Sequence, residues 1–287
     1  MKAAKFVFLY MGLLFGLLNH SRAQIYPKEL SFYPEILKTH GLEAYPADDP
    51  FVYLQYLRPE SMVNSHKWQR LIKILDKKFK KERGTDFLRY IFFKTQEMVL
   101  QDYMVYASFS ETLAEGKYDC VTGSAVYGLL LKRYGFPFDI IETDNHVFVI
   151  VSRDEKHDII FESTWKIDGF IHAAHEAEHF FSQFTATSSV SSNAESTLHL
   201  GNLSPAHSKN STFRTIGFKE LNGLQFYNDA IKKFEGRAYK EAYFQMKMAA
   251  TWYPSERILR LQALLKQLNE EHQSHKVIST IPDSAAP

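Results

Sequence analysis

The hydrophobic pattern of this chain changes its period twice, and this constrains the fold more than any other feature of the sequence. From residue 62 to residue 134, apolar residues recur at the spacing of amphipathic helices. From 138 to 162 the chain instead contains three short runs rich in β-branched and aromatic residues. Helical spacing returns after Gly217. This order predicts an α+β fold, in which helices precede a three-stranded antiparallel meander and a small all-α region follows it.

Turn-forming residues divide the pattern into elements. Gly135 is expected to end a helix that begins at Asp119 or Cys120, and Pro137 prevents that helix from resuming. Short polar turns separate the strands, as is typical of antiparallel hairpins. The predicted helices are 62–81, 87–106, 119–134, 217–234, 238–252 and 256–268, and the predicted strands are 138–143, 146–152 and 158–162.

The first 23 residues have the organisation of a secretory signal peptide. Two lysines precede an uncharged, mostly apolar run over residues 6–18, and small residues at Ser21 and Ala23 predict cleavage before Gln24. A membrane anchor is the alternative, but the apolar run is shorter than the roughly 20 residues that span a bilayer. The sequence therefore predicts an exported protein, periplasmic or secreted, without stable membrane insertion.

The composition excludes several classes of function. The chain has 34 Lys and Arg against 33 Asp and Glu, and its formal net charge of +1 becomes −2 when Lys2, Lys5 and Arg22 are removed. This balance does not favour nucleic acid as a partner, because nucleic-acid-binding domains need a basic surface. The single cysteine, Cys120, excludes an internal disulfide and a cysteine-based zinc cage.

Changes in composition predict the domain organisation. Residues 24–59 are rich in proline and aromatics and are interpreted as an extended lead-in. Nine of the sixteen residues from 182 to 197 are Ser or Thr, which indicates a linker and a domain boundary. The predicted parts are a signal peptide (1–23), the lead-in (24–59), an α+β domain (60–182), the linker (183–212), a helical region (213–270) and a polar tail (271–287).

Three residues have the order and placement of a catalytic triad. Cys120 stands at the predicted start of a helix, where unpaired amide hydrogens and the helix dipole favour a negatively charged sulfur. His146 opens the second predicted strand, and Glu162 closes the third. A cysteine on a helix, facing a histidine that a carboxylate orients, is a nucleophile–base–orienter arrangement. A free thiol in an exported chain is open to oxidation, so Cys120 is expected either to be buried or to have a functional role.

These residues lie in ordered blocks that resemble the transglutaminase-like superfamily. The blocks are Gly116-x-x-x-Cys120, Gly135-Phe136-Pro137, His146-Val147-Phe148-Val149 and Phe161-Glu162-Ser163-Thr164-Trp165. The resemblance covers residues 85–170 and implies a papain-like core, with Cys120 as nucleophile, His146 as general base and Glu162 as the orienting acid. Two positions depart from the family pattern. Glu162 stands where the family usually has Asp, and Val147-Phe148 replaces an Ala-Trp type block.

The resemblance implies an exported thiol enzyme that acts on amide bonds of a peptide or protein through an acyl-Cys120 intermediate. Hydrolysis, as in a cysteine protease, is favoured over transfer of the acyl group to an amine. No cofactor and no metal ion are implied. The glutamate at 162 keeps an alternative open, which is a catalytically silent module of the same fold that binds without turnover.

A second motif suggests a zinc hydrolase. His175-Glu176-Ala177-Glu178-His179 matches H-E-x-x-H, in which two histidines one helical turn apart bind zinc and Glu176 acts as the base. Glu195 is the candidate third ligand. The charge of Glu178 and the flanking His172 favour a solvated helix instead.

The C-terminal region resembles a single tetratricopeptide repeat. Free-standing arrays of this repeat need about three copies, and only one is visible here. Packing of the helix pair against the first domain is therefore favoured, and a groove for a protein partner is the alternative. The matching positions are Phe226, Ala230, Gly236, Tyr239, Ala242, Met246, Ala249 and Pro254.

Overall fold

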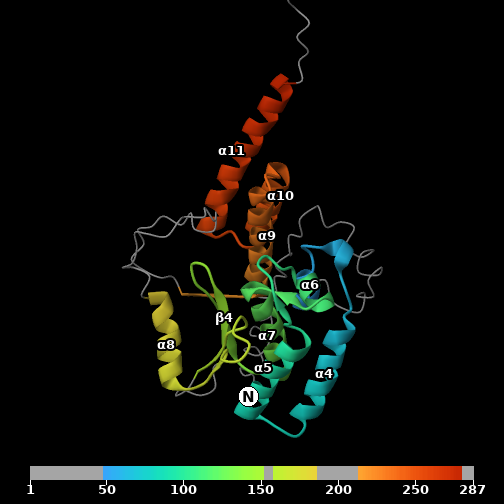
Figure 1. Ribbon diagram of the computed structural model, residues 1–287, viewed down its shortest axis with the longest axis vertical. Helices are drawn as coiled ribbons and strands as arrows, with labels where there is room; N and C mark the ends of the chain where they lie inside the picture. Colours follow the sequence, from blue (N-terminus) through green and yellow to red (C-terminus); the bar gives the residue numbers. More distant parts are fainter. Residues whose placement is uncertain (1–47, 152–157, 186–212, 280–287) are drawn as a thin grey trace, which may run out of the picture. The chain divides into compact units, whose positions relative to one another are not determined.

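A computed structural model describes residues 48–151, 158–185 and 213–279 of the chain (Figure 1). These residues all belong to one compact unit, which spans residues 36–287. The predicted signal peptide with its cleavage before Gln24, and nearly all of the predicted linker, lie outside the described ranges. Within those ranges, no helix combines the length and the apolar character that crossing a bilayer requires.

The described chain begins with a short helix that is part of the core. All but the first residue of α3 (Pro50–Tyr53) are buried, and the rings of Phe51 and Trp68 stack with their centroids 5.5 Å apart. A 3-10 turn, η2 (Pro59–Ser61), follows. The lead-in predicted to be extended over 24–59 is thus helical near its end, because its apolar side chains contribute to the core.

Two amphipathic helices come next, and both were expected. The first buries Trp68, Leu71 and Leu75 on one face. The second ends at Met98 rather than at residue 106, because the chain then forms a short parallel strand pair. The elements of this part are α4 (His66–Phe79), α5 (Gly84–Met98), β1 (Asp102–Tyr103), α6 (Phe109–Ala114) and β2 (Lys117–Tyr118).

The helix α7 (Cys120–Tyr134) has the ends predicted from the sequence. The Asp119 carboxylate accepts a hydrogen bond from the Thr122 amide at 2.9 Å, and the Thr122 hydroxyl oxygen accepts one from the Asp119 amide at 3.0 Å. This reciprocal cap satisfies two amide groups at the start of the helix. At the other end Gly135 has a φ of 72°, a left-handed conformation that glycine adopts without steric cost.

A five-stranded antiparallel sheet confirms the α+β class and the predicted meander. The strand order is β6-β5-β4-β3-β7, and every neighbouring pair is antiparallel. The two outer strands were not predicted, because each is only two or three residues long. The strands are β3 (Phe138–Glu142), β4 (Val147–Val151), β5 (Ile159–Phe161), β6 (Phe170–Ile171) and β7 (Arg214–Ile216).

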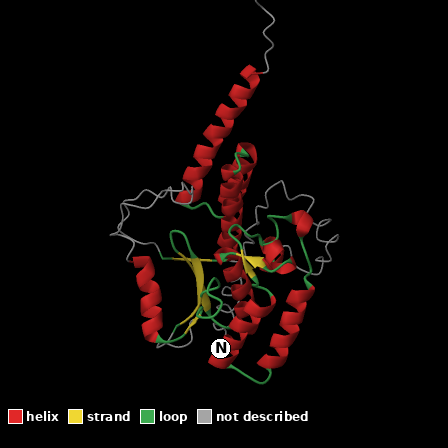
Figure 2. Cartoon of the chain, in the orientation of Figure 1, coloured by secondary structure: helices red, strands yellow, loops and turns green. Residues whose placement is uncertain are grey.

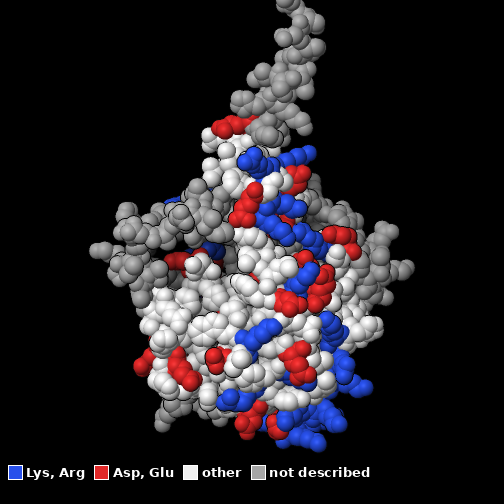
Figure 3. Space-filling view, viewed as in Figure 1, with Lys and Arg blue, Asp and Glu red and all other residues white. Residues whose placement is uncertain are grey.

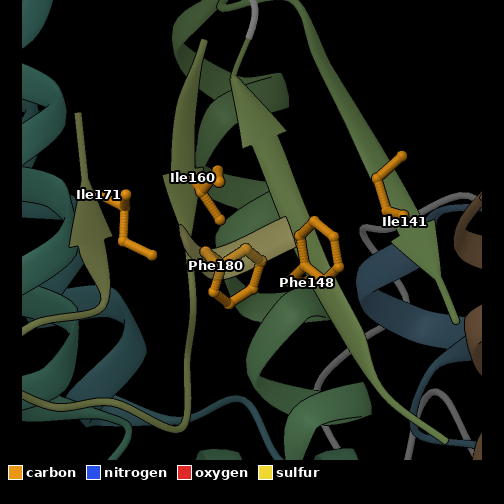
Figure 4. Packing of buried hydrophobic residues seen from close by; sticks show 5 residues of the cluster. All are labelled: Ile141, Phe148, Ile160, Ile171 and Phe180. Atoms are coloured by element: carbon orange, nitrogen blue, oxygen red, sulfur yellow. The ribbon is translucent and has the colours of Figure 1, made fainter. Parts of the chain in front are cut away.

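Helices cover both faces of this sheet (Figures 1 and 2). On one face, the ring of Tyr127 in α7 lies 5.0 Å from that of Phe161 in β5. On the other face, Phe180 of α8 (Ala174–Thr185) packs on a cluster of buried strand residues. Figure 4 shows this cluster, in which Ile141, Phe148, Ile160 and Ile171 come from four different strands.

The helices after the sheet were predicted, but the strand in front of them was not. Residues 214–216 form β7 and pair with β3, so the chain completes the sheet before the helices begin. Its backbone supplies hydrogen bonds that the edge of β3 would otherwise lack. The last helix extends to Ser279, so the predicted polar tail is partly helical. The helices are α9 (Phe218–Glu235), α10 (Tyr239–Trp252) and α11 (Glu256–Ser279).

The helix α9 packs against the part of the chain that precedes the sheet. The Gln225 side chain accepts a hydrogen bond from the Phe109 amide at 2.8 Å and donates one to the Leu54 carbonyl at 3.2 Å. Arg58 forms an ion pair with Asp229, which is buried. The first of the repeat-like helices therefore packs against the α+β domain and the segment in front of it. On the face shown in Figure 3, acidic and basic side chains are interspersed.

Candidate active site

The only cysteine of the chain is the first residue of α7 and is partly accessible to solvent. Two local features hold it in place. The strand β2 ends one residue before the cap Asp119, and the cap fixes the first turn of the helix. A Cβ atom on Gly123 would lie 2.6 Å from the Cβ of Ser163, so glycine at this position allows α7 to approach the segment that follows β5. That segment also contains Glu162.

The predicted base and its orienting acid are in direct contact. His146 Nε2 lies 2.6 Å from Glu162 Oε2. The side chain of Glu162 is 1% exposed, and its other oxygen accepts hydrogen bonds from the Thr164 amide at 2.8 Å and the Thr164 hydroxyl at 2.6 Å. The backbone of His146 is tied to Thr143, with an amide-to-carbonyl distance of 2.8 Å across the β3–β4 turn. Both ends of the His146–Glu162 contact are therefore held by local hydrogen bonds.

Cys120 lines the same cleft as the imidazole of His146 and affects its pKa. Burial lowers the pKa of His146, but the interactions with Cys120 and Glu162 outweigh burial and raise the pKa to about 10. The imidazole therefore carries a proton at neutral pH. The structure thus brings Cys120, His146 and Glu162 together, as the sequence predicted.

An aromatic side chain from α8 covers the same imidazole. The rings of Phe184 and His146 are nearly parallel, at an interplanar angle of 9° and a centroid distance of 5.9 Å. The ring of Phe148 also stacks on Phe184, at 5.7 Å. An aromatic face attracts a cationic ring and restricts its rotation. Nothing in the sequence pairs Phe184 with His146, because the contact depends on how α8 lies across the sheet.

Cys120 and His146 line a cleft of about 180 Å³, and α9 supplies one of its walls. The side-chain Nδ2 of Asn228 in α9 donates to Asp119 Oδ2 at 3.2 Å, so this helix directly contacts the residue that caps α7 in front of Cys120. Burial raises the pKa of Asp119 to about 6, and hydrogen bonds from Thr122 and Asn228 oppose that rise. The α9 residues that line the cleft are Leu224, Tyr227, Asn228 and Ile231.

One further side chain of the cleft is a hydrogen-bond donor. Tyr103 lies in β1, and its backbone pairs with that of Tyr118, two residues before the nucleophile. Burial raises the pKa of Tyr103 to about 12, and the charges of Cys120, Asp119 and Glu162 add to this effect. The hydroxyl therefore keeps its proton near these acidic groups. The sequence alone does not distinguish Tyr103 from its neighbours Tyr106 and Tyr118.

The histidines of the H-E-x-x-H segment lie on the exposed face of α8. His175, Glu176 and His179 are all solvent-exposed, whereas the buried side of the helix is aromatic. Among the residues that the structure describes, no three metal-ligating side chains come together. Glu195, the candidate third ligand, lies outside those residues.

Comparison of this chain with protein-family models, with curated proteins and with solved structures finds no match.

Proposed function

We propose that this protein is a cysteine-dependent enzyme of the transglutaminase-like type, with a papain-like core, that acts on amide bonds of a peptide. The observation that carries the proposal is the 2.6 Å contact between His146 and the buried Glu162, in a cleft that Cys120 also lines. A nucleophile, a base and an orienting carboxylate in this order are what acyl transfer through a thioester requires.

The reaction begins with the sulfur of Cys120 beside the protonated His146. The sulfur attacks the amide carbon, and the electron pair of the carbonyl moves to its oxygen. As the carbonyl re-forms, the C–N bond breaks and the nitrogen takes the proton of His146, which leaves a thioester on Cys120 and a neutral imidazole. A water molecule then gives a proton to His146 and attacks the thioester, releasing the acid and the sulfur. An amine in place of water would give acyl transfer, and hydrolysis is the outcome we favour.

The negative oxygen of the intermediate needs two hydrogen-bond donors. The backbone amide of Cys120, at the first position of α7, is one candidate. The protonated hydroxyl of Tyr103, on the wall of the same cleft, is the other. Loss of one such donor typically lowers kcat by about 10²–10³.

The test is covalent labelling of the purified protein with a thiol-reactive peptide probe, followed by mapping of the labelled residue. We expect labelling at Cys120, none in Cys120→Ala and at least tenfold slower labelling in His146→Ala. His175→Ala, on the exposed face of α8, is the matched control and should label within about threefold of the unmodified chain. If iodoacetamide reaches the thiol but the peptide probe and amide substrates do not react, the proposal fails and the silent binding module replaces it.

We further propose that the protein is exported and cleaved before Gln24. The basic start, the apolar run over residues 6–18 and the small residues before the cleavage point support this. Determining the N-terminal sequence of protein produced with its complete chain tests it. A mature chain that begins at Gln24 is the expected result, and one that begins at Met1 would contradict the proposal.

A further inference from the structure

The loop that carries Glu162 is closed by its own backbone. The amide of Glu162 donates to the Gly169 carbonyl at 2.8 Å, and the amide of Gly169 donates to the Trp165 carbonyl at 2.9 Å. A Cβ atom on Gly169 would lie 2.1 Å from the Glu162 carbonyl oxygen, so only glycine permits this closure. These hydrogen bonds and the close approach of Gly169 therefore fix the backbone of the loop over residues 162–169.

This closed loop presents large apolar side chains to solvent. Trp165 is 38% exposed and Ile167 is 80% exposed. Single exposed apolar residues are common on protein surfaces. These two differ because they line an open hollow of about 600 Å³ together with Tyr103, which is 54% exposed. Ligand sites commonly measure about 300–1,000 Å³.

The hollow adjoins the cleft that contains the thiol. Tyr103 lines both, so the hollow and the cleft lie on either side of this residue. The cleft itself, at about 180 Å³, has room for little more than one side chain, since a cavity of about 150 Å³ holds benzene. A substrate that extends beyond the reacting amide therefore has the hollow as its next contact surface.

The charged side chains of the hollow balance each other. Lys166 and Asp168, which also line the hollow, give it one charge of each sign. The hollow therefore selects for apolar surface rather than for charge.

We propose that the hollow is a substrate subsite, which binds a bulky apolar side chain of an extended peptide lying across Cys120. The subsite rests on the proposed thiol chemistry, because the hollow adjoins the reacting group. Trp165 and Ile167 supply the apolar contacts. An amide too short to reach past Tyr103 makes none of these contacts.

The kinetic test compares short acyl amides with peptides in which each position in turn is Phe, Leu or Ala. One position at which Phe or Leu raises kcat/KM about tenfold over Ala is the expected result. Ile167→Ser should remove most of this gain through KM, with kcat unchanged, because contacts made equally in ground and transition states change KM alone. Short amides should be unaffected. Leu259→Ser, which changes an exposed residue of α11, is the matched control. Equal losses for short and long substrates in Ile167→Ser would overturn the subsite.

A binding measurement separates failure of the subsite from failure of the chemistry. The Cys120→Ala protein keeps the hollow, and the fluorescence of Trp165 reports its occupancy. We expect a Phe-containing peptide to bind this variant about tenfold more tightly than the same protein with Ile167→Ser added. If binding is lost in the double variant but the native chain shows no turnover, the proposed function fails and the subsite stands. If both proteins bind the peptide equally, the subsite is overturned whatever the turnover.

Discussion

Replacing Glu162 with glutamine is the sharpest test of the contact that organises the site. The two oxygens of Glu162 face different donors, the imidazole of His146 on one side and the amide and hydroxyl of Thr164 on the other. An amide side chain has only one oxygen. With that oxygen toward Thr164, the NH₂ group faces the N–H of the imidazole, and in the opposite orientation it faces the Thr164 amide. In either case one buried donor loses its acceptor.

The size of the effect follows from burial. The Glu162 side chain is 1% exposed, so the donor that loses its acceptor is shielded from water, and such a donor costs about 1–3 kcal/mol. We expect Glu162→Gln to lower the free energy of unfolding by an amount near the upper end of this range at pH values where the imidazole is protonated. Removing the carboxylate also lowers the pKa of His146 from about 10, because Glu162 is one of the two groups that raise it. Turnover should fall at least tenfold, and by up to about 10⁴.

The assay combines urea unfolding at several pH values with an NMR titration of the His146 ring. The pKa of His146 is raised in the folded state, so the stability it contributes is complete below about 6.5 and is lost as the pH rises through about 10. The free energy of unfolding of the native protein should fall between pH 6.5 and about pH 10. In Glu162→Gln this fall should be smaller. Thr164→Val is the matched control, since it removes one donor to Glu162 and leaves the contact with His146. A His146 ring that still titrates near pH 10 in Glu162→Gln would refute the reasoning.

Two further substitutions test how other helices support the site. Phe184→Leu removes the ring stacked on His146, a contact worth about 1 kcal/mol, so kcat should fall about fivefold with KM unchanged. Phe181→Leu, from the same helix, should leave kcat within twofold, and equal losses in the two variants would contradict a positioning role for Phe184. Asn228→Leu removes a hydrogen bond that lowers the pKa of Asp119, so that pKa should rise further above its value of about 6. A carboxyl group whose folded pKa is raised loses stability as pH rises, so urea unfolding should show a deficit of about 1–2 kcal/mol at pH 8 and little at pH 4. An equal loss of stability in Asn228→Leu at both pH values would contradict this prediction.

Local chemistry carried most of what the sequence predicted correctly. The change of hydrophobic period located six of the described helices (α4, α5, α7, α9, α10 and α11) and the three inner strands, because each period is set by neighbours a few residues apart. The ends of α7 followed from a capping aspartate and a glycine that adopts a left-handed φ. The same local reasoning put Cys120 at a helix start and placed His146 and Glu162 at strand ends. These placements needed no knowledge of how the elements pack.

Contacts between distant segments were decided only by the tertiary structure. The pairing of Ile216 with Ile140 joins β7 to the sheet across a long stretch of chain. A strand of three residues is too short to be predicted from its sequence pattern. The stacking of Phe184 on His146 and the contact of Asn228 with Asp119 depend on where α8 and α9 lie against the core. Such positions result from the summed packing of many side chains, whereas a periodic pattern records only which face of an element is apolar. The sequence by itself therefore determined where Cys120, His146 and Glu162 stand within their helix and strands, and the tertiary packing decided which side chains surround them.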